Sequence, residues 1–192
     1  MRNIPYGKHN IDNQDIEEVA KVLKSNWITQ GKIVEQFESE LCNTCDAKFA
    51  TVVNSATSAL HIACSTLGLT DNDYLWTTPN SFVASSNCGL YCGAQVDFVD
   101  INPKTYNMSI ESLKHKLIDA EIHGKLPKVI IPVHFGGQSC DMRAIYALSK
   151  QYGFKIIEDA SHAIGGKYKN TSIGSCKYSD ITVLSFHPVK II

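Results

Sequence analysis

The sequence predicts an α/β protein built on a mostly parallel sheet. Short β-branched and apolar runs alternate, along 192 residues, with segments whose apolar side chains recur at helical spacing. This alternation is typical of parallel sheets, because two parallel strands must be joined by a crossover connection. The sequence contains no internal repeat and no low-complexity linker. A chain of this length can form one domain with a substantial core.

The first expected helix covers residues 12–23, where Ile16, Val19 and Leu23 share one face and Asp12 is placed to act as N-cap. Residues 26–31 then form a loop. The other expected helices are 34–42, 59–63, a segment that follows Pro79, a segment capped by Ser109 that holds Leu113, Leu117 and Ile118, and 142–152.

The expected strands are 49–53, 74–78, 95–99, 129–133, 156–157 and 181–186. Binding sites in parallel sheets form where the strands end, at their carboxyl edge. The motifs considered below all follow strands, so the fold can bring them together at that edge.

Charge and cysteine content exclude several classes of function. Lys and Arg total 18 against 19 Asp and Glu, so no field of one sign is available for nucleic acid or an anionic membrane. The start has no apolar signal region, and no stretch approaches the roughly 20 apolar residues of a membrane span. Seven cysteines without a signal peptide predict reduced thiols and a cytoplasmic protein with neither nucleic-acid nor membrane partners.

The pair Cys42 and Cys45 forms a CxxC motif that zinc or redox proteins also use. A zinc ribbon needs a second CxxC, but Cys88 and Cys92 have the wrong spacing. A thioredoxin-like pair lies between a strand and a helix, whereas Cys42 lies inside the helical pattern that begins at residue 34. We therefore expect no metal site and favour small, buried apolar roles for these cysteines.

Two ionisable residues stand at strand ends. Lys190 follows the strand 181–186, and a partly desolvated amine on such a support is a nucleophile toward carbonyls, although a solvated lysine is the alternative. Asp159 ends the run 156–159, where a carboxylate can keep a pyridine nitrogen protonated. Together they match the needs of a pyridoxal 5'-phosphate (PLP) site. Ser185 lies five residues before Lys190, so the two can share a site only if the chain bends, as His187-Pro188 permits.

Three further segments carry weaker indications. Residues 54–58, Asn-Ser-Ala-Thr-Ser, lie between a strand and a helix and can bind a phosphate. The alternative is that the segment is an ordinary Ser/Thr helix cap. Phe82 is a candidate to stack on a cofactor ring or, alternatively, a core aromatic. His162 can bind a ring substituent or serve as a structural histidine.

Four motifs carry a resemblance to a known family: 54–60 (Asn-Ser-Ala-Thr-Ser-Ala-Leu), 77–84 (Thr-Thr-Pro-Asn-Ser-Phe-Val-Ala), 158–163 (Glu-Asp-Ala-Ser-His-Ala) and 185–190 (Ser-Phe-His-Pro-Val-Lys). In order and spacing they resemble the DegT/StrS family of sugar-nucleotide aminotransferases, which are PLP enzymes of fold type I. The resemblance implies a seven-stranded-type, mostly parallel sheet with helices on both faces. Residues 1–33 would form an N-terminal helix and substrate-side loop, and 34–192 a PLP-binding large domain. Because family members are about twice as long, this domain would be incomplete at its C-terminus and the small domain absent.

The resemblance also implies roles for individual residues. Lys190 would form the Schiff base with PLP and shuttle protons, and Asp159 would pair with the pyridinium nitrogen. A lysine at this position, where family dehydratases carry histidine, implies transamination. The remaining residues would contact the cofactor (Ala56, Thr57 and Ser185 at the phosphate, Phe82 stacked on the ring, His162 at its phenolic oxygen) or border the sugar nucleotide (Tyr6, Asn26, Trp27, Ile28 and Thr29).

Within the family, the sequence resembles the subgroup of pseudaminic acid biosynthesis, and the resemblance lies at Tyr6, residues 28–31 and His187. This implies amination of a UDP-linked 4-keto-6-deoxy-N-acetylhexosamine by L-glutamate, giving UDP-4-amino-4,6-dideoxy-N-acetyl-altrosamine, in a homodimer of the full-length form. The alternatives are another keto sugar nucleotide, of the perosamine or bacillosamine type, and a non-catalytic truncated fragment.

Overall fold

A five-stranded parallel sheet forms the centre of the protein, in the strand order β2-β1-β3-β4-β7. The structure is a computed structural model and describes residues 9–190. The strands of this sheet are β1 (Tyr74–Thr77), β2 (Gln95–Phe98), β3 (Val129–Ile130), β4 (Lys155–Asp159) and β7 (Ile181–Val183). A separate antiparallel hairpin joins β5 (Lys167–Tyr168) to β6 (Thr171–Ser172).

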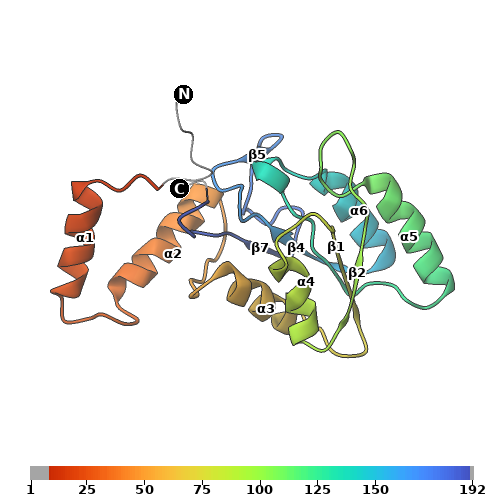
Figure 1. Ribbon diagram of the computed structural model, residues 1–192, viewed down its shortest axis with the longest axis horizontal. Coiled ribbons are helices and arrows are strands. Elements are labelled where there is room, and N and C mark those ends of the chain that lie inside the picture. The colour runs from red at the N-terminus through yellow and green to blue at the C-terminus, as the bar shows by residue number, and fades with distance from the viewer. Residues whose placement is uncertain (1–8, 191–192) are drawn as a thin grey trace, which may run out of the picture.

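The helices are α1 (Asn13–Leu23), α2 (Lys32–Cys45), α3 (Ala56–Thr66), α4 (Ala84–Tyr91), α5 (Ile110–Ile122) and α6 (Met142–Tyr152), with a short 3-10 turn, η1 (Phe135–Gly137). Of these, α3 and α4 cover one face of the sheet, and α5 and α6 cover the other. Figure 1 shows α3 beside α4 and α5 beside α6. Successive strand residues point to opposite faces, so Leu75 packs in one core with α3 and α4, and Trp76 in the other with α5 and α6. The α/β fold with a mostly parallel sheet is therefore confirmed.

Among residues 9–190, five strands form the parallel sheet, and β5 and β6 pair only with each other. One expectation about strands is wrong. The run 49–53 forms no strand. Its backbone is not paired with the sheet: the N–H of Val52 donates to Glu38 Oε1 at 2.8 Å, and Phe49 is 78% exposed. The β-branched composition of this run predicted a strand, but the run forms the connection between α2 and α3.

The predicted helix caps are confirmed. Asp12 accepts the N–H groups of Gln14 and Asp15, and Asp15 returns the interaction to the Asp12 N–H, which completes a capping box. Ser109 accepts the N–H of Ser112 at the start of α5. The expected helix at 142–152 coincides with α6.

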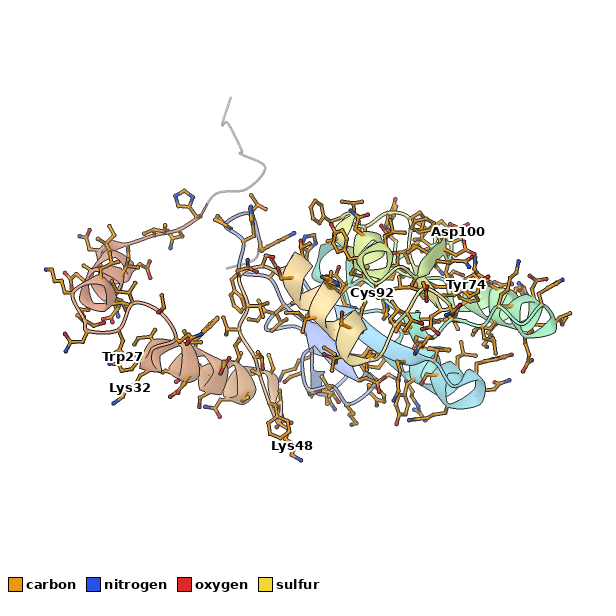
Figure 2. All side chains as sticks on the ribbon, turned by 90° about the horizontal axis from the view of Figure 1, so that it is seen from below. Trp27, Lys32, Lys48, Tyr74, Cys92 and Asp100 are labelled. Carbon is orange, nitrogen blue, oxygen red and sulfur yellow. The ribbon has the colours of Figure 1, made fainter. Side chains whose placement is uncertain are left out.

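The helices α1 and α2 lie to one side of the sheet in both views (Figures 1 and 2). None of the side chains of α1 is buried. Since α2 begins at Lys32, the division that we expect between residues 33 and 34 falls in its first turn, and it stays a prediction. Cys42 and Cys45 both belong to α2, as the helical pattern predicted for Cys42. Among residues 9–190, no helix combines the length and apolar character that a bilayer crossing requires.

The topology places the sequence motifs that follow the strands at one edge of the sheet. All five strands are parallel, so their carboxyl ends meet there. The C-terminal end of α3 lies at the opposite edge, because Lys128 Nζ, just before β3, donates to Gly68 O. The N-terminus of α3, with Ala56 and Thr57, therefore lies at the carboxyl edge.

Candidate active site

Asp159 is the last residue of β4 and is only 4% exposed. Its Oδ2 accepts the hydroxyl of Ser85, at the start of α4, at 2.6 Å. Its Oδ1 accepts the Ser161 hydroxyl at 2.6 Å and the Ser161 N–H at 3.2 Å. Within the described part of the chain, no basic side chain forms an ion pair with Asp159. A buried carboxylate surrounded by neutral donors is well suited to bind a cationic donor from a ligand.

Lys190 and His162 meet beside this carboxylate. Lys190 Nζ lies 2.9 Å from His162 Nε2, and His162 is three residues beyond Asp159. Burial and the neighbouring Lys190 charge lower the pKa of His162 below its ordinary value, and Asp159 opposes them only in part. His162 is therefore neutral and accepts a hydrogen bond from the amine at neutral pH.

The expected bend between Ser185 and Lys190 is confirmed. The N–H of Lys190 donates to His187 O at 2.8 Å, which closes a turn through Pro188. The turn brings the Lys190 amine back toward the end of β4, where His162 accepts its hydrogen bond. Ser185 is buried at the start of this turn, and its hydroxyl accepts the N–H of His187.

The first turn of α3 offers backbone donors to an anion. Ser55 is the N-cap, and its hydroxyl accepts the N–H of Ser58 at 3.1 Å. The first N–H groups of a helix lack intrahelical acceptors, and here they belong to the half-buried Ala56 and Thr57. The structure confirms that Ser55 caps the helix, and the binding of a phosphate by these N–H groups stays a prediction.

Phe82 precedes α4 and is 71% exposed, which rules out the core role in this structure. Its neighbour Ser81 bonds to Ser85, at 2.7 Å between the hydroxyl oxygens, and Ser85 bonds to Asp159. The aromatic ring therefore belongs to the segment that supports Asp159. At the end of β1, the buried hydroxyl of Thr78 has no hydrogen-bond partner among the residues that the structure describes.

The segment 26–29 is not brought to this edge. Trp27 and Ile28 are exposed in the loop between α1 and α2, and the hydrogen bonds of Trp27 stay within the loop, with Ser25. Figure 2 places Trp27 beside the start of α2, well to one side of the sheet. Tyr6 lies outside the described residues. The substrate-side role of Tyr6, Asn26, Trp27, Ile28 and Thr29 stays a prediction.

Sequence reasoning missed Ser81, Ser85 and Ser161, which form the hydroxyl network around Asp159. Ser161 had a local signal, because an aspartate two residues before a serine commonly forms an Asx-turn. Ser85 had none, since it meets Asp159 across 74 positions of sequence.

The assembled groups define the ligand that they suit. An anion fits the N-terminus of α3, an exposed aromatic face is available at Phe82, a cationic ring atom fits Asp159, and a carbonyl fits the amine of Lys190. The unpartnered Thr78 hydroxyl offers a further hydrogen bond at the same edge. These features fit PLP, which combines a phosphate, a pyridine ring and an aldehyde.

Comparisons with known proteins show which family the chain resembles. The sequence model of the DegT/DnrJ/EryC1/StrS aminotransferase family matches residues 9–192. A curated relative from Campylobacter jejuni, named UDP-4-amino-4,6-dideoxy-N-acetyl-beta-L-altrosamine transaminase, is 42% identical over 187 residues, which are 97% of this chain and 48% of the relative.

Two solved structures are also similar. One is Helicobacter pylori PseC, an aminotransferase involved in the biosynthesis of pseudoaminic acid, with a TM-score of 0.89, 33% identity and coverage of 98% of this chain and 49% of that one. The other is Spr1654 from Streptococcus pneumoniae in its PLP-form, with a TM-score of 0.87, 28% identity and coverage of 98% and 50%. The chain thus spans about half the length of the relatives it matches. With four motifs in family order and a family match over nearly its whole length, the chain belongs to the DegT/DnrJ/EryC1/StrS aminotransferase family.

Proposed function

We propose that the protein acts as a PLP-dependent sugar-nucleotide aminotransferase. The observation that carries the proposal is the meeting of Lys190, His162 and Asp159 at the carboxyl edge of the sheet, with 2.9 Å between Lys190 Nζ and His162 Nε2. Solved relatives include Spr1654 in both its PLP-form and its PMP-form, which supports the choice of cofactor.

PLP supplies a carbonyl that reacts with amines and a ring that withdraws electrons from the carbon bearing the amine. Lys190 would bind the cofactor covalently and later hold a proton on Nζ. Asp159 would keep the ring nitrogen protonated, because its buried carboxylate accepts from hydroxyl groups and forms no ion pair with any residue between 9 and 190. His162 would accept a hydrogen bond at Nε2, which favours one orientation of the amine.

The other contacts would fix the position of the ring. Ala56 and Thr57 would bind the phosphate through the first turn of α3, together with Ser185. Phe82 would cover one face of the ring and exclude water from it.

For the substrate we propose a UDP-linked 4-keto-6-deoxy-N-acetylhexosamine, aminated at C4 with L-glutamate as donor, with the altrosamine derivative as product. The name of the Campylobacter jejuni relative and the pathway of Helicobacter pylori PseC support this choice. A homodimer and a cytoplasmic location, where seven thiols stay reduced, complete the proposal. Another keto sugar nucleotide is the alternative substrate.

Covalent labelling tests the proposal. The protein is incubated with PLP, reduced with borohydride and digested, and the pyridoxyl group is located by mass spectrometry. We expect the group on Lys190 and its loss in Lys190→Ala, whereas Lys169→Ala, a change of the exposed lysine between β5 and β6, keeps it. Labelling of another lysine with Lys190 unmodified would refute the assignment. Amination of the UDP-4-keto sugar, assayed with glutamate, then tests the substrate.

A further inference from the structure

His134 is a histidine that the proposed chemistry does not use, and it is fully buried just beyond β3. Its Nε2 lies 2.8 Å from Glu158 Oε2, and its Nδ1 accepts the N–H of Cys140 at 3.2 Å. Because Nδ1 accepts, the ring proton resides on Nε2, which donates to the carboxylate. The ring therefore ties together the two ends of residues 134–140, which we call the His134 loop.

Glu158 is the second half of this buried pair. Its Oε1 accepts the hydroxyls of Ser179 and Thr182, so three donors surround the carboxylate. Burial raises the pKa of Glu158, but the hydrogen bonds from His134 and the hydroxyls outweigh burial and hold that pKa below its usual value. Glu158 is thus a charged acceptor at neutral pH, and His134 cannot turn away without leaving it underbonded.

The His134 loop contacts both acidic and basic residues of the candidate active site through the backbone. The N–H of His134 donates to Asp159 O at 3.0 Å, and the N–H of Asp159 donates to Pro132 O at 3.0 Å. Gly137 presses against the next turn: a Cβ at this position would lie 2.7 Å from His162 O. One loop therefore borders Asp159 on one side and His162 on the other.

We propose that His134 is a positioning residue, which with Glu158 holds the His134 loop against Asp159 and His162 and so fixes how these two groups face a ligand. The functional meaning of this role rests on the proposed PLP chemistry, whereas the contacts themselves do not. The loop has a second anchor, because Asn107 accepts the Phe135 N–H and donates to Gln138 O. Removing the His134 contacts should therefore shift the loop without unfolding it.

Two substitutions separate the contacts of His134. The amide nitrogen of Gln reaches the position of Nε2, so His134→Gln keeps the bond to Glu158 and loses the one to Cys140. The amide oxygen of Asn reaches the position of Nδ1, so His134→Asn does the reverse. His115→Gln, on the exposed face of α5, is the control for the same chemical change.

A second pair of variants leaves the buried histidine intact. Gly137→Ala pushes the loop away from His162 O, while Gly136→Ala places its Cβ where no atom lies within 4 Å. Both glycines have positive φ, 87° and 59°, so both substitutions strain the backbone and only one disturbs His162. This pair decides the question even where a His134 variant fails to fold.

The first readout is the titration of the His162 ring, followed by NMR in protein without PLP. We expect the His162 pKa to rise toward 6.5 in His134→Gln and Gly137→Ala, as the ring moves away from the charge of Lys190, and to stay unchanged in both controls. The exposed ring of His123, which directly follows α5, serves as the reference within each sample. The second readout is the dissociation constant for PLP, which should increase about tenfold in the same two variants.

Four outcomes of these measurements decide whether His134 is a positioning residue. A rise of the His162 pKa together with weaker PLP binding supports the inference. A lower melting temperature with unchanged His162 titration and PLP affinity would overturn it and make His134 purely structural. Equal effects of Gly136→Ala and Gly137→Ala would also overturn it. If the wild type is not labelled at Lys190, the proposed function fails, while the His162 titration still decides whether His134 positions that residue.

Discussion

The hydroxyl of Ser85 should stabilise the folded protein mainly through Asp159. Ser85 is fully buried, and its Oγ donates to Asp159 Oδ2 at 2.6 Å, as one of three hydrogen bonds to that carboxylate. A hydrogen bond to a charged group contributes about 1.5–3 kcal/mol. Ser85→Ala should therefore lower the free energy of unfolding by about 1.5–3 kcal/mol at neutral pH. For a domain of this size, each kcal/mol corresponds to about 2–4 °C in melting temperature.

Ligand binding should reduce this loss. If the cationic ring of PLP pairs with Asp159, it supplies part of the interaction that Ser85 no longer makes, so saturating PLP should stabilise Ser85→Ala more than the wild type. Urea unfolding followed by circular dichroism, with and without PLP, measures both effects. Ser86→Ala is the matched control, because Ser86 lies in the same helical turn and, among residues 9–190, its hydroxyl donates only to Val83 O.

The control should lose about 0.5–1.5 kcal/mol, the value of a neutral hydrogen bond, with or without PLP. Equal losses in the Ser85 and Ser86 variants would show that Asp159 does not depend on Ser85. A difference between wild type and Ser85→Ala that PLP leaves unchanged would show that the ring cation does not reach this carboxylate.

Three further predictions concern stability, pH and thiol reactivity. Leu117→Ala, in the core beneath α5, should lower the free energy of unfolding by about 2–5 kcal/mol, whereas its half-exposed neighbour Ile118→Ala should cost less than about 1 kcal/mol in the same urea titration. The depressed pKa of Glu158 contributes stability that is complete above pH 4.5 and is lost as pH falls through the pKa of the folded state. Between about pH 3 and 7, the free energy of unfolding of Glu158→Gln should therefore fall less steeply with acid than that of the wild type, by up to about 1.4 kcal/mol per pH unit. Identical slopes in the two proteins would contradict the pairing of Glu158 with His134. Burial raises the pKa of Cys140 to about 12, so iodoacetamide at pH 8 should spare Cys140 and first modify the half-buried Cys42, Cys92 and Cys176, as peptide mapping would reveal. Early modification of Cys140 would show that the His134 loop opens.

Periodicity predicted the helices well because their signals are local. The apolar spacing and cap of 12–23 lie within the segment itself, and the structure confirms both. The run 49–53 shows the limit of this reasoning. Its composition suits a strand, but pairing depends on which backbone groups lie nearby, and the Val52 N–H is taken by Glu38 of α2. The composition of the run does not reveal that Glu38 binds this backbone N–H in place of a neighbouring strand.

The candidate site also contains residues that local sequence predicted and residues that it did not. Asp159, His162 and Lys190 were predicted from motifs at strand ends, and the structure brings His162 and Lys190 into contact beside Asp159. The partner Ser85 arrives from another helix, so no spacing rule could have identified it. The positioning role of His134 had only a weak signal, a polar residue after an apolar strand, because its partner Glu158 is recognisable only once β3 and β4 lie side by side.

Core packing decides which of the two consecutive carboxylates faces the candidate site. Ile157 packs in the core beneath α3 and α4, and Asp159, two residues later, points to the same face and meets Ser85 of α4. Ile156 packs in the core beneath α5 and α6, so Glu158 points to that face and meets His134. A slip of β4 by one residue would exchange the two carboxylates and expose the wrong apolar side chains to each core. The pairing of Asp159 with Val183 of β7 fixes the same register from the neighbouring strand, from which the chain continues to Lys190. The burial of a few isoleucines and valines thus places the acid beside the amine, and the chemistry of the edge depends on the apolar core behind it.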